Sequence, residues 1–335
     1  MLISREIIPS QILFLLLISL NASAQKPGNL HVISHNRTTV ICNPSTGSNS
    51  FISWGNFPSE KMPVRKIIMH VTLGSPDSFL TAHWDYLDRI NLLRKGGKTG
   101  KPLNLELGRM LTPYGSIFGK GWSWKWEADV TDFAPFLRDS AEIEYIHTGY
   151  EASNVGWALT IDFEIISGPP VMDYLGMVPL WNGGYKYGDP TEKIEDKLLP
   201  QTFEVSPNVA VNRIRIQHTG HGMDRPKNCS EFCPRWREIK VDDKRIDFRN
   251  MWKDCGANPL YPQGGTWIYD RAYWCPGDLQ NLMLLTLMPR LVNTRCRLLL
   301  IPIPPPKIYK LWNRSRHTCF SIPAPNKKSM LQLKR

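Results

Sequence analysis

Two acidic residues stand in surroundings that suit catalysis. The stretch NCSEFCPRW places Glu231 between Cys229 and Cys233, and HWDYL places Asp85 directly after Trp84. Two carboxyl groups whose pKa values differ can share the work of a general acid and a general base. An Asp beside a packed Trp is also common at strand ends and turns, so the short motif around Asp85 does not decide its role.

The cysteines around Glu231 could bind a metal, carry redox chemistry or form a disulfide. With His218 and His221, the thiols of Cys229 and Cys233 would make four nitrogen and sulfur ligands of the kind that bind zinc. Their spacing departs from the common zinc signatures. The choice between these three interpretations depends on the compartment in which the protein works.

The N-terminus indicates export. Arg5 is followed by the apolar stretch Ile12–Leu20, which is too short to span a bilayer, and by Ala22-Ser23-Ala24, which is typical of a cleavage site. We expect residues 1–24 to be a signal peptide, although a buried N-terminal helix is the alternative. The mature protein would then be secreted or periplasmic, with no membrane association after cleavage.

Export favours disulfides over thiols. In an oxidising compartment we expect a short bridge Cys229–Cys233 and a second bridge Cys255–Cys275, with no metal at either pair. Three further cysteines remain, Cys42, Cys296 and Cys319.

The net charge of +11 is confined to the end of the chain. Residues 279–335 contain 11 Lys and Arg and no acidic residue, while the rest carries 30 basic and 30 acidic residues. The body therefore lacks the basic surface of a nucleic-acid-binding protein. The composition of this tail suggests the hypothesis that the reading frame is lost soon after Asp278; a genuine basic or disordered tail is the alternative.

Alternating apolar residues predict an all-β protein. The stretches KIIMHVTLG, WSWKWEADV and GWALTIDFEII all have a period of two, and REIKVDDKRIDF predicts a hairpin around Asp242-Asp243. We expect two antiparallel β-sandwich (jelly-roll) domains, residues 25–168 and 171–278, separated at Gly168-Pro169-Pro170 and followed by the tail 279–335. The second domain would be incomplete if the tail is out of frame.

Four stretches carry a resemblance to a known family. TGHG…NCSEFC, NPLYPQGGTWIYDRAYWCPG, AHWDY and VTDF are similar to the peptide-N-glycosidase F family of bacterial secreted amidases, over Ile67 to Gly277. The resemblance implies two jelly rolls side by side with the active site between them. It also implies hydrolysis of the side-chain amide of glycosylated Asn, giving Asp and a glycosylamine without a metal or cofactor. Its substrates would be N-glycosylated peptides or glycoproteins, and we expect a monomer.

The same resemblance assigns roles to individual residues. It implies that Asp85 is the essential aspartate and Glu231 the second carboxylate, held by the small disulfide loop. Arg271 would keep Glu231 ionised and orient it.

The resemblance also indicates a substrate-binding group of residues: Trp84, His147, His221 and Trp274. Trp274 could stack on a sugar ring or simply pack against Cys275.

The sequence departs from the family pattern near the first carboxylate. His147 stands where the family has a Glu, Glu151 falls out of register, and Tyr86 replaces the Arg usual after the essential Asp. Thr219 replaces an aromatic residue, and Asp88, without a family counterpart, is expected to be a surface charge. Three alternatives stay open: a carbohydrate-binding protein without chemistry, an inactive truncated amidase, and a metal-dependent hydrolase.

Overall fold

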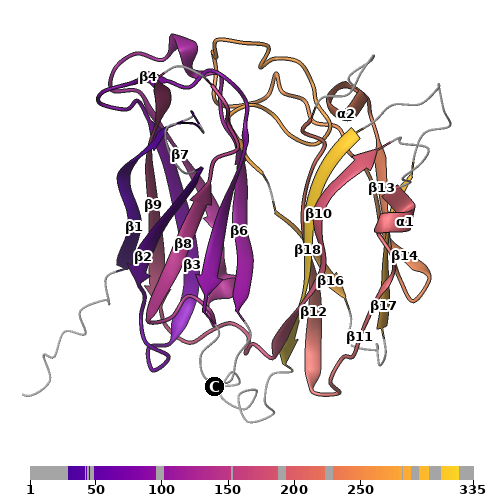
Figure 1. Cartoon of the computed structure of the whole chain (residues 1–335). Helices are drawn as coiled ribbons and strands as arrows, with labels where there is room; N and C mark the ends of the chain where they lie inside the picture. Colours follow the sequence, from indigo (N-terminus) through magenta and orange to yellow (C-terminus); the bar gives the residue numbers. More distant parts are fainter. Residues whose placement is uncertain are drawn as a thin grey trace, which may run out of the picture.

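The computed structural model describes residues 29–41, 43, 45, 49–95, 102–151, 154–187, 194–222, 229–280, 282–287, 294–301 and 311–323. The chain forms mainly β-strands, arranged as two sandwiches side by side (Figure 1). The expected all-β class is confirmed. Among these residues, no helix has the length and apolar character needed to span a membrane. The expected signal peptide lies outside the described residues.

The first sandwich contains two five-stranded sheets. One has the order β1-β9-β3-β7, with β4 pairing in parallel with β9, and the other has the order β15-β6-β5-β8-β2. The strands are β1 (Leu30–Ile41), β2 (Ser50–Asn56), β3 (Val64–Gly74), β4 (Leu80–Thr81), β5 (Leu87–Arg94), β6 (Leu103–Leu111), β7 (Ser123–Asp129), β8 (Ser140–Ile146), β9 (Val155–Ser167) and β15 (Asp278–Leu279). Two short 3-10 helices are η1 (Gly115–Ile117) and η2 (Thr131–Phe133).

The period of two in the sequence explains the core of this sandwich. Successive side chains of a strand point to opposite faces, so every second residue reaches the interior. The residues buried in this way are Ile67, Met69, Val71 and Leu73 of β3 and Trp157, Leu159, Ile161, Phe163 and Ile165 of β9. The alternation predicted for these two strands is confirmed.

The second sandwich contains two four-stranded sheets, β10-β18-β12-β16 and β11-β17-β13-β14. The strands are β10 (Gly176–Tyr187), β11 (Gln201–Phe203), β12 (Val209–Thr219), β13 (Trp236–Val241), β14 (Lys244–Asn250), β16 (Met283–Leu287), β17 (Thr294–Ile301) and β18 (Leu311–Pro323), with the short helices α1 (Ile194–Lys197) and α2 (Cys229–Phe232). The predicted hairpin is β13–β14. Asp242 and Asp243 form its turn with φ of 48° and 61°, values that Asp tolerates better than most residues.

The basic tail supplies three of these strands, which differs from the expected domain end at Asp278. In the backbone pairing, β18 lies between β10 and β12, and β17 lies between β11 and β13. Both strands are inner strands, so a chain without them would expose new edges in both sheets. The hypothesis of frame loss concerns the gene and stays a prediction.

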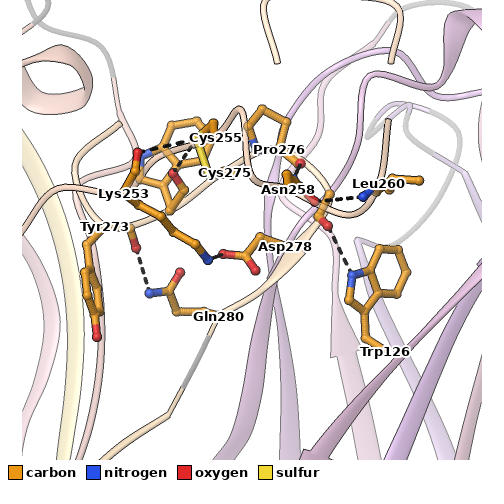
Figure 2. A network of polar contacts seen from close by, with 12 residues as sticks. Trp126, Lys253, Cys255, Asn258, Leu260, Tyr273, Cys275, Pro276, Asp278 and Gln280 are labelled. Atoms are coloured by element: carbon orange, nitrogen blue, oxygen red, sulfur yellow. Dashed lines mark hydrogen bonds and ion pairs between the residues drawn. A yellow bond between two sulfur atoms is a disulfide. The ribbon is translucent and has the colours of Figure 1, made fainter. Parts of the chain in front are cut away.

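The loop between β14 and β15, residues 251–277, connects the two sandwiches; we call it the β14–β15 loop. Cys255 and Cys275 form a disulfide in it, with 5.5 Å between their Cα atoms, as predicted. Asn258 Nδ2 donates to Pro276 O at 2.7 Å, and Trp126 Nε1 of β7 donates to Gly277 O at 3.1 Å (Figure 2). The loop is therefore held both to itself and to the first sandwich.

The disulfide should contribute substantially to stability. The two cysteines are 20 residues apart, and closing a loop of this size restricts the unfolded chain by about 3 kcal/mol. Replacing both Cys255 and Cys275 by Ala should lower the free energy of unfolding by about that amount. Denaturant unfolding measures it, and the unaltered protein under reducing conditions is the matched comparison. An unchanged unfolding midpoint would contradict the prediction.

Candidate active site

Asp85 lies in the turn between β4 and β5, at the end of the first sandwich. Buried Thr112 holds both of its neighbours: Thr112 Oγ1 donates to Trp84 O at 2.6 Å and accepts from Tyr86 N at 2.8 Å. The side chain of Glu151 accepts a hydrogen bond from His83 N at 3.1 Å. The backbone on each side of Asp85 is thus fixed by side chains from other segments.

The second sandwich brings His221 and Glu231 to Asp85. His221, just after β12, donates from Nε2 to the backbone carbonyl of Asp85 at 2.6 Å. Glu231 lies in α2 and is buried, and its Oε1 accepts from Gly222 N at 3.3 Å. Side-chain atoms of Asp85, His221 and Glu231 all lie within 4.8 Å of one another. Two carboxyl groups and an imidazole from the two sandwiches therefore converge.

Arg271 lies in the β14–β15 loop and acts on this cluster. Its guanidinium is buried and donates to Tyr269 O at 2.7 Å and to Thr266 O at 2.8 Å, which shapes the β14–β15 loop. It also lies 4.9 Å from the centre of the Trp274 ring, a cation–π distance. Its positive charge acts on Asp85. Arg271 is thus both a structural anchor of the loop and a positive charge that acts on Asp85.

The environment of Asp85 has opposing effects on the pKa of its carboxyl group. Burial raises the pKa of the Asp85 carboxyl above its ordinary value, because desolvation disfavours the charged form. The charges of His221 and Arg271 and a hydrogen bond from Tyr114 act in the opposite direction, but desolvation is larger. The result is a carboxyl whose protonated and ionised forms lie closer in energy at neutral pH than those of an exposed Asp.

Tyr114 is the second partner of this carboxyl. It is buried, its side chain forms a hydrogen bond with Asp85, and its hydroxyl lies 3.4 Å from Thr266 Oγ1. Burial raises the pKa of Tyr114 to about 12, and the Asp85 charge adds to this effect. The hydroxyl therefore stays protonated and serves as a donor to Asp85.

The chain is similar in sequence to known proteins. A family model described as "Peptide-N-glycosidase F, C terminal" matches residues 189–305 and so extends past Asp278. The peptide-N(4)-(N-acetyl-beta-D-glucosaminyl)asparagine amidase F of Elizabethkingia miricola is 28% identical over 230 residues. That alignment covers 66% of this chain and 63% of the relative's length.

Solved structures show the same fold. PNGase F, a glycosylasparaginase from Flavobacterium meningosepticum, superimposes with a TM-score of 0.75 at 21% identity, covering 88% of this chain and 96% of that one. PNGF-II superimposes with a TM-score of 0.67 at 14% identity, covering 89% and 66%. The chain is thus similar to the peptide-N-glycosidase F family in sequence and in fold. The two sandwiches expected for this family are therefore present.

Within this peptide-N-glycosidase F fold, the residues expected to bind substrate fall into two groups. Trp84 is 52% exposed and offers a ring face beside Asp85, and half-buried His221 contacts Asp85 directly. Trp274 is fully buried against Leu87 and Leu111, so of the two roles expected for it the structure supports packing and not sugar stacking.

His147 is the other residue that differs from the expectation of substrate contact, because its side chain is only 1% exposed. Its Nδ1 lies 2.8 Å from Asp88 Oδ2, and its ring meets that of Tyr86 edge-on with centroids 5.1 Å apart. The expectation that Asp88 is a surface charge is wrong. Asp88 is fully buried and also accepts from Tyr145 Oη at 2.6 Å and Thr148 N at 3.2 Å.

The short cysteine loop is described in part. Cys233 is disulfide-bonded, whereas the side chain of its expected partner Cys229 lies outside the described residues. A disulfide at Cys233 is not compatible with the zinc-ligand interpretation of its thiol, since metal binding requires a free thiolate.

Two residues that shape the site were not found from the sequence. Thr112 and Tyr114 come from the stretch LTPYG at the end of β6, where Pro113 and Gly115 indicate a turn. A turn after a strand marks a possible functional loop. Contact with Asp85 depends on the pairing of β5 with β6, which the local pattern does not encode.

Removing the Tyr114 hydroxyl should change the titration of Asp85. The hydrogen bond favours the ionised carboxylate, so Tyr114→Phe should raise the pKa of Asp85 further above its ordinary value. Carboxyl 13C NMR on protein labelled at Asp measures this shift directly. Tyr150→Phe, which alters an exposed tyrosine, is the control and should leave the Asp85 titration unchanged. An equal or lower pKa in Tyr114→Phe would refute the role of this donor.

Proposed function

We propose that the protein is an exported amidase that hydrolyses the side-chain amide linking asparagine to the first sugar of an N-linked glycan. The observation that carries this proposal is the convergence of Asp85 and Glu231 from two separate sandwiches on one half-buried position. Similarity to the peptide-N-glycosidase F family supports the reaction class. Substrates are N-glycosylated peptides or glycoproteins, and the protein acts as a monomer.

Amide hydrolysis requires three catalytic tasks, and the residues of the site are suited to them. Water must lose a proton as it attacks the carbonyl carbon, the carbonyl oxygen must be stabilised as negative charge develops, and the leaving nitrogen must gain a proton. Asp85, with its raised pKa, can accept the proton from water and return it to the nitrogen. Cleavage of the C–N bond then gives aspartate and a glycosylamine, which loses ammonia in water.

The remaining residues have supporting roles in this proposal. Glu231 carries the second carboxyl group and accepts hydrogen bonds from the sugar or the attacking water. Exposed Trp84 gives the first sugar ring an apolar face beside Asp85. The positive charge of Arg271 favours the ionised form of Asp85. The reaction needs no cofactor under this scheme.

Replacing Asp85 by Asn tests the assignment. Asn cannot accept the proton from water, so we expect the rate to fall by at least about 100-fold. Incubation with a denatured N-glycoprotein, followed by mass spectrometry of the peptide, detects the conversion of Asn to Asp. Asp77→Asn, at a highly exposed position in the same segment, is the matched control and should keep full activity. An undiminished rate in Asp85→Asn would refute the assignment.

The same replacement should not weaken the fold. Because the folded pKa of Asp85 is raised, the unfolded chain ionises first as pH rises, and the native state loses stability until the folded pKa is passed. Asp85→Asn removes this cost, so at neutral pH its melting temperature should equal or exceed that of the unaltered protein. The difference should shrink below the ordinary Asp pKa of about 3.9. A variant that melts lower at neutral pH would show that loss of activity reflects misfolding.

A metal-dependent hydrolase is the alternative with a specific observation behind it. The atoms of Asp85, His221 and Glu231 are close enough together to hold a metal ion. A divalent ion bound by two carboxylates and a histidine could activate water in place of Asp85. Under our proposal, exhaustive treatment with EDTA leaves the amidase rate unchanged, and added Zn²⁺ does not increase it. Loss of activity on chelation that zinc restores would favour the metal mechanism, whereas glycan binding without turnover would favour a binding protein.

A further inference from the structure

A cavity lies between the two sandwiches, at the opposite end from Asp85. Its volume is about 950 Å³, within the range of small-molecule sites. Strand β9 marks the two ends: Val155 pairs with Leu80 near the candidate active site, whereas Ser167 pairs with Val64, which lines the cavity. The walls come from the first sandwich, the linker that follows β9, and strands β12 and β16.

Two polar side chains in the cavity wall are buried and incompletely satisfied. Arg215 is 3% exposed and donates from Nη2 to Leu107 O at 3.1 Å, but its Nε and Nη1 have no hydrogen-bond partner among the described residues. Gln280 is 4% exposed; its Nε2 donates to His218 O and Tyr273 O, while its Oε1 has no partner there. Buried polar atoms of native proteins nearly always have a partner, so these three atoms in one cavity wall are consistent with an occupant of the cavity.

The two orphaned groups require opposite partners. The guanidinium of Arg215 lies over the Phe133 ring at 4.5 Å and 3.7 Å from Asp132 Oδ2, and its Nε and Nη1 can still donate to an acceptor. A carboxylate is the acceptor that a guanidinium binds best. Burial lowers the pKa of Arg215 to about 10, so the guanidinium keeps its charge at neutral pH. The amide oxygen of Gln280 needs a donor such as a hydroxyl group. A ligand with only one of these groups would leave the other side chain unsatisfied.

Nearby carboxylates add to the demand for donors. Asp132 lies 3.4 Å from Arg213 and 3.7 Å from Arg215, the latter beyond hydrogen-bond distance. Asp129 and Asp132 also line the cavity. The lining carries six basic and five acidic side chains, a small positive excess that tolerates one added negative charge better than several. Carboxylate oxygens accept more than one hydrogen bond, so hydroxyl groups can donate to them beside their present partners, whereas an aliphatic chain cannot.

We propose that this cavity binds a sugar acid, a monosaccharide that carries one carboxylate and several hydroxyl groups. The carboxylate pairs with Arg215, a hydroxyl group donates to Gln280 Oε1, and other hydroxyl groups contact Asp129 and Asp132. Half-buried Tyr174 lines the cavity and offers an aromatic ring to the sugar. This site is separate from the amidase site, so a test of sugar-acid binding is independent of a test of the proposed function.

Isothermal titration calorimetry with glucuronate as the probe tests the proposal. Glucose differs from it by lacking the carboxylate, and hexanoate carries a carboxylate without hydroxyl groups. We expect glucuronate to bind and both comparison compounds to bind at least about tenfold more weakly. Absence of glucuronate binding, or equal binding of all three compounds, would overturn the proposal and leave water as the occupant.

Two variants distinguish the contribution of the Arg215 charge to binding from the contribution of the cavity volume. Arg215→Met should weaken glucuronate binding at least about tenfold, while Arg37→Met, an exposed arginine outside the cavity, should bind normally. If Arg215→Met fails to fold in a thermal melt, Ala128→Trp provides the second test, because it fills the cavity and keeps the charge. Each folded variant should retain its amidase rate. Unchanged glucuronate binding in Arg215→Met or in Ala128→Trp would contradict the proposal.

Discussion

The candidate active site depends on one constraint: the β14–β15 loop must be fixed to the first sandwich. Asp85 belongs to one sandwich, whereas His221, Glu231 and Arg271 belong to the second half of the chain. The loop crosses between them, since Tyr114 N donates to Gln263 Oε1 at 3.0 Å and Gly277 N donates to Leu111 O at 2.9 Å. Strand β15 then continues the sheet of the first sandwich. Without these bonds the two carboxyl groups would lie on bodies free to separate.

The position of Asp85 lowers the stability of the fold and suits the carboxyl group for proton transfer. A half-buried carboxyl that loses water is destabilised in its charged form, and the nearby positive charges and the Tyr114 hydroxyl offset only part of this loss. A fully exposed Asp would be cheaper for the fold but would exchange protons only weakly at neutral pH. Rigid hydrogen bonds from Thr112 to both neighbours of Asp85 keep the carboxyl in this costly place. A local cost to stability of this kind is typical of functional sites.

Local patterns predicted the strands and one disulfide, because a period of two and the cysteine pair 255 and 275 follow from short segments. They did not predict what depends on which strands pair. Asp88 reads as a surface charge in sequence, yet β5 is an inner strand between β6 and β8, so its side chain is buried beside Tyr145. Trp274 suits a sugar platform by type, yet packing against Leu87 and Leu111 removes it from the surface. Thr112 and Tyr114 reach Asp85 only through the β5–β6 pairing.

The departures from the family pattern are linked in space. The resemblance expects an Arg at position 86 and a Glu at 147, whereas this chain has Tyr86 and His147, whose rings pack edge-on. Asp88 fixes the orientation of this histidine, since its Oδ2 lies 2.8 Å from His147 Nδ1. Gly149 completes the arrangement, because a Cβ there would lie 2.0 Å from His147 Nε2. Two positions where the family pattern is charged are therefore occupied in this chain by buried aromatic rings, since Tyr86 is 5% and His147 1% exposed.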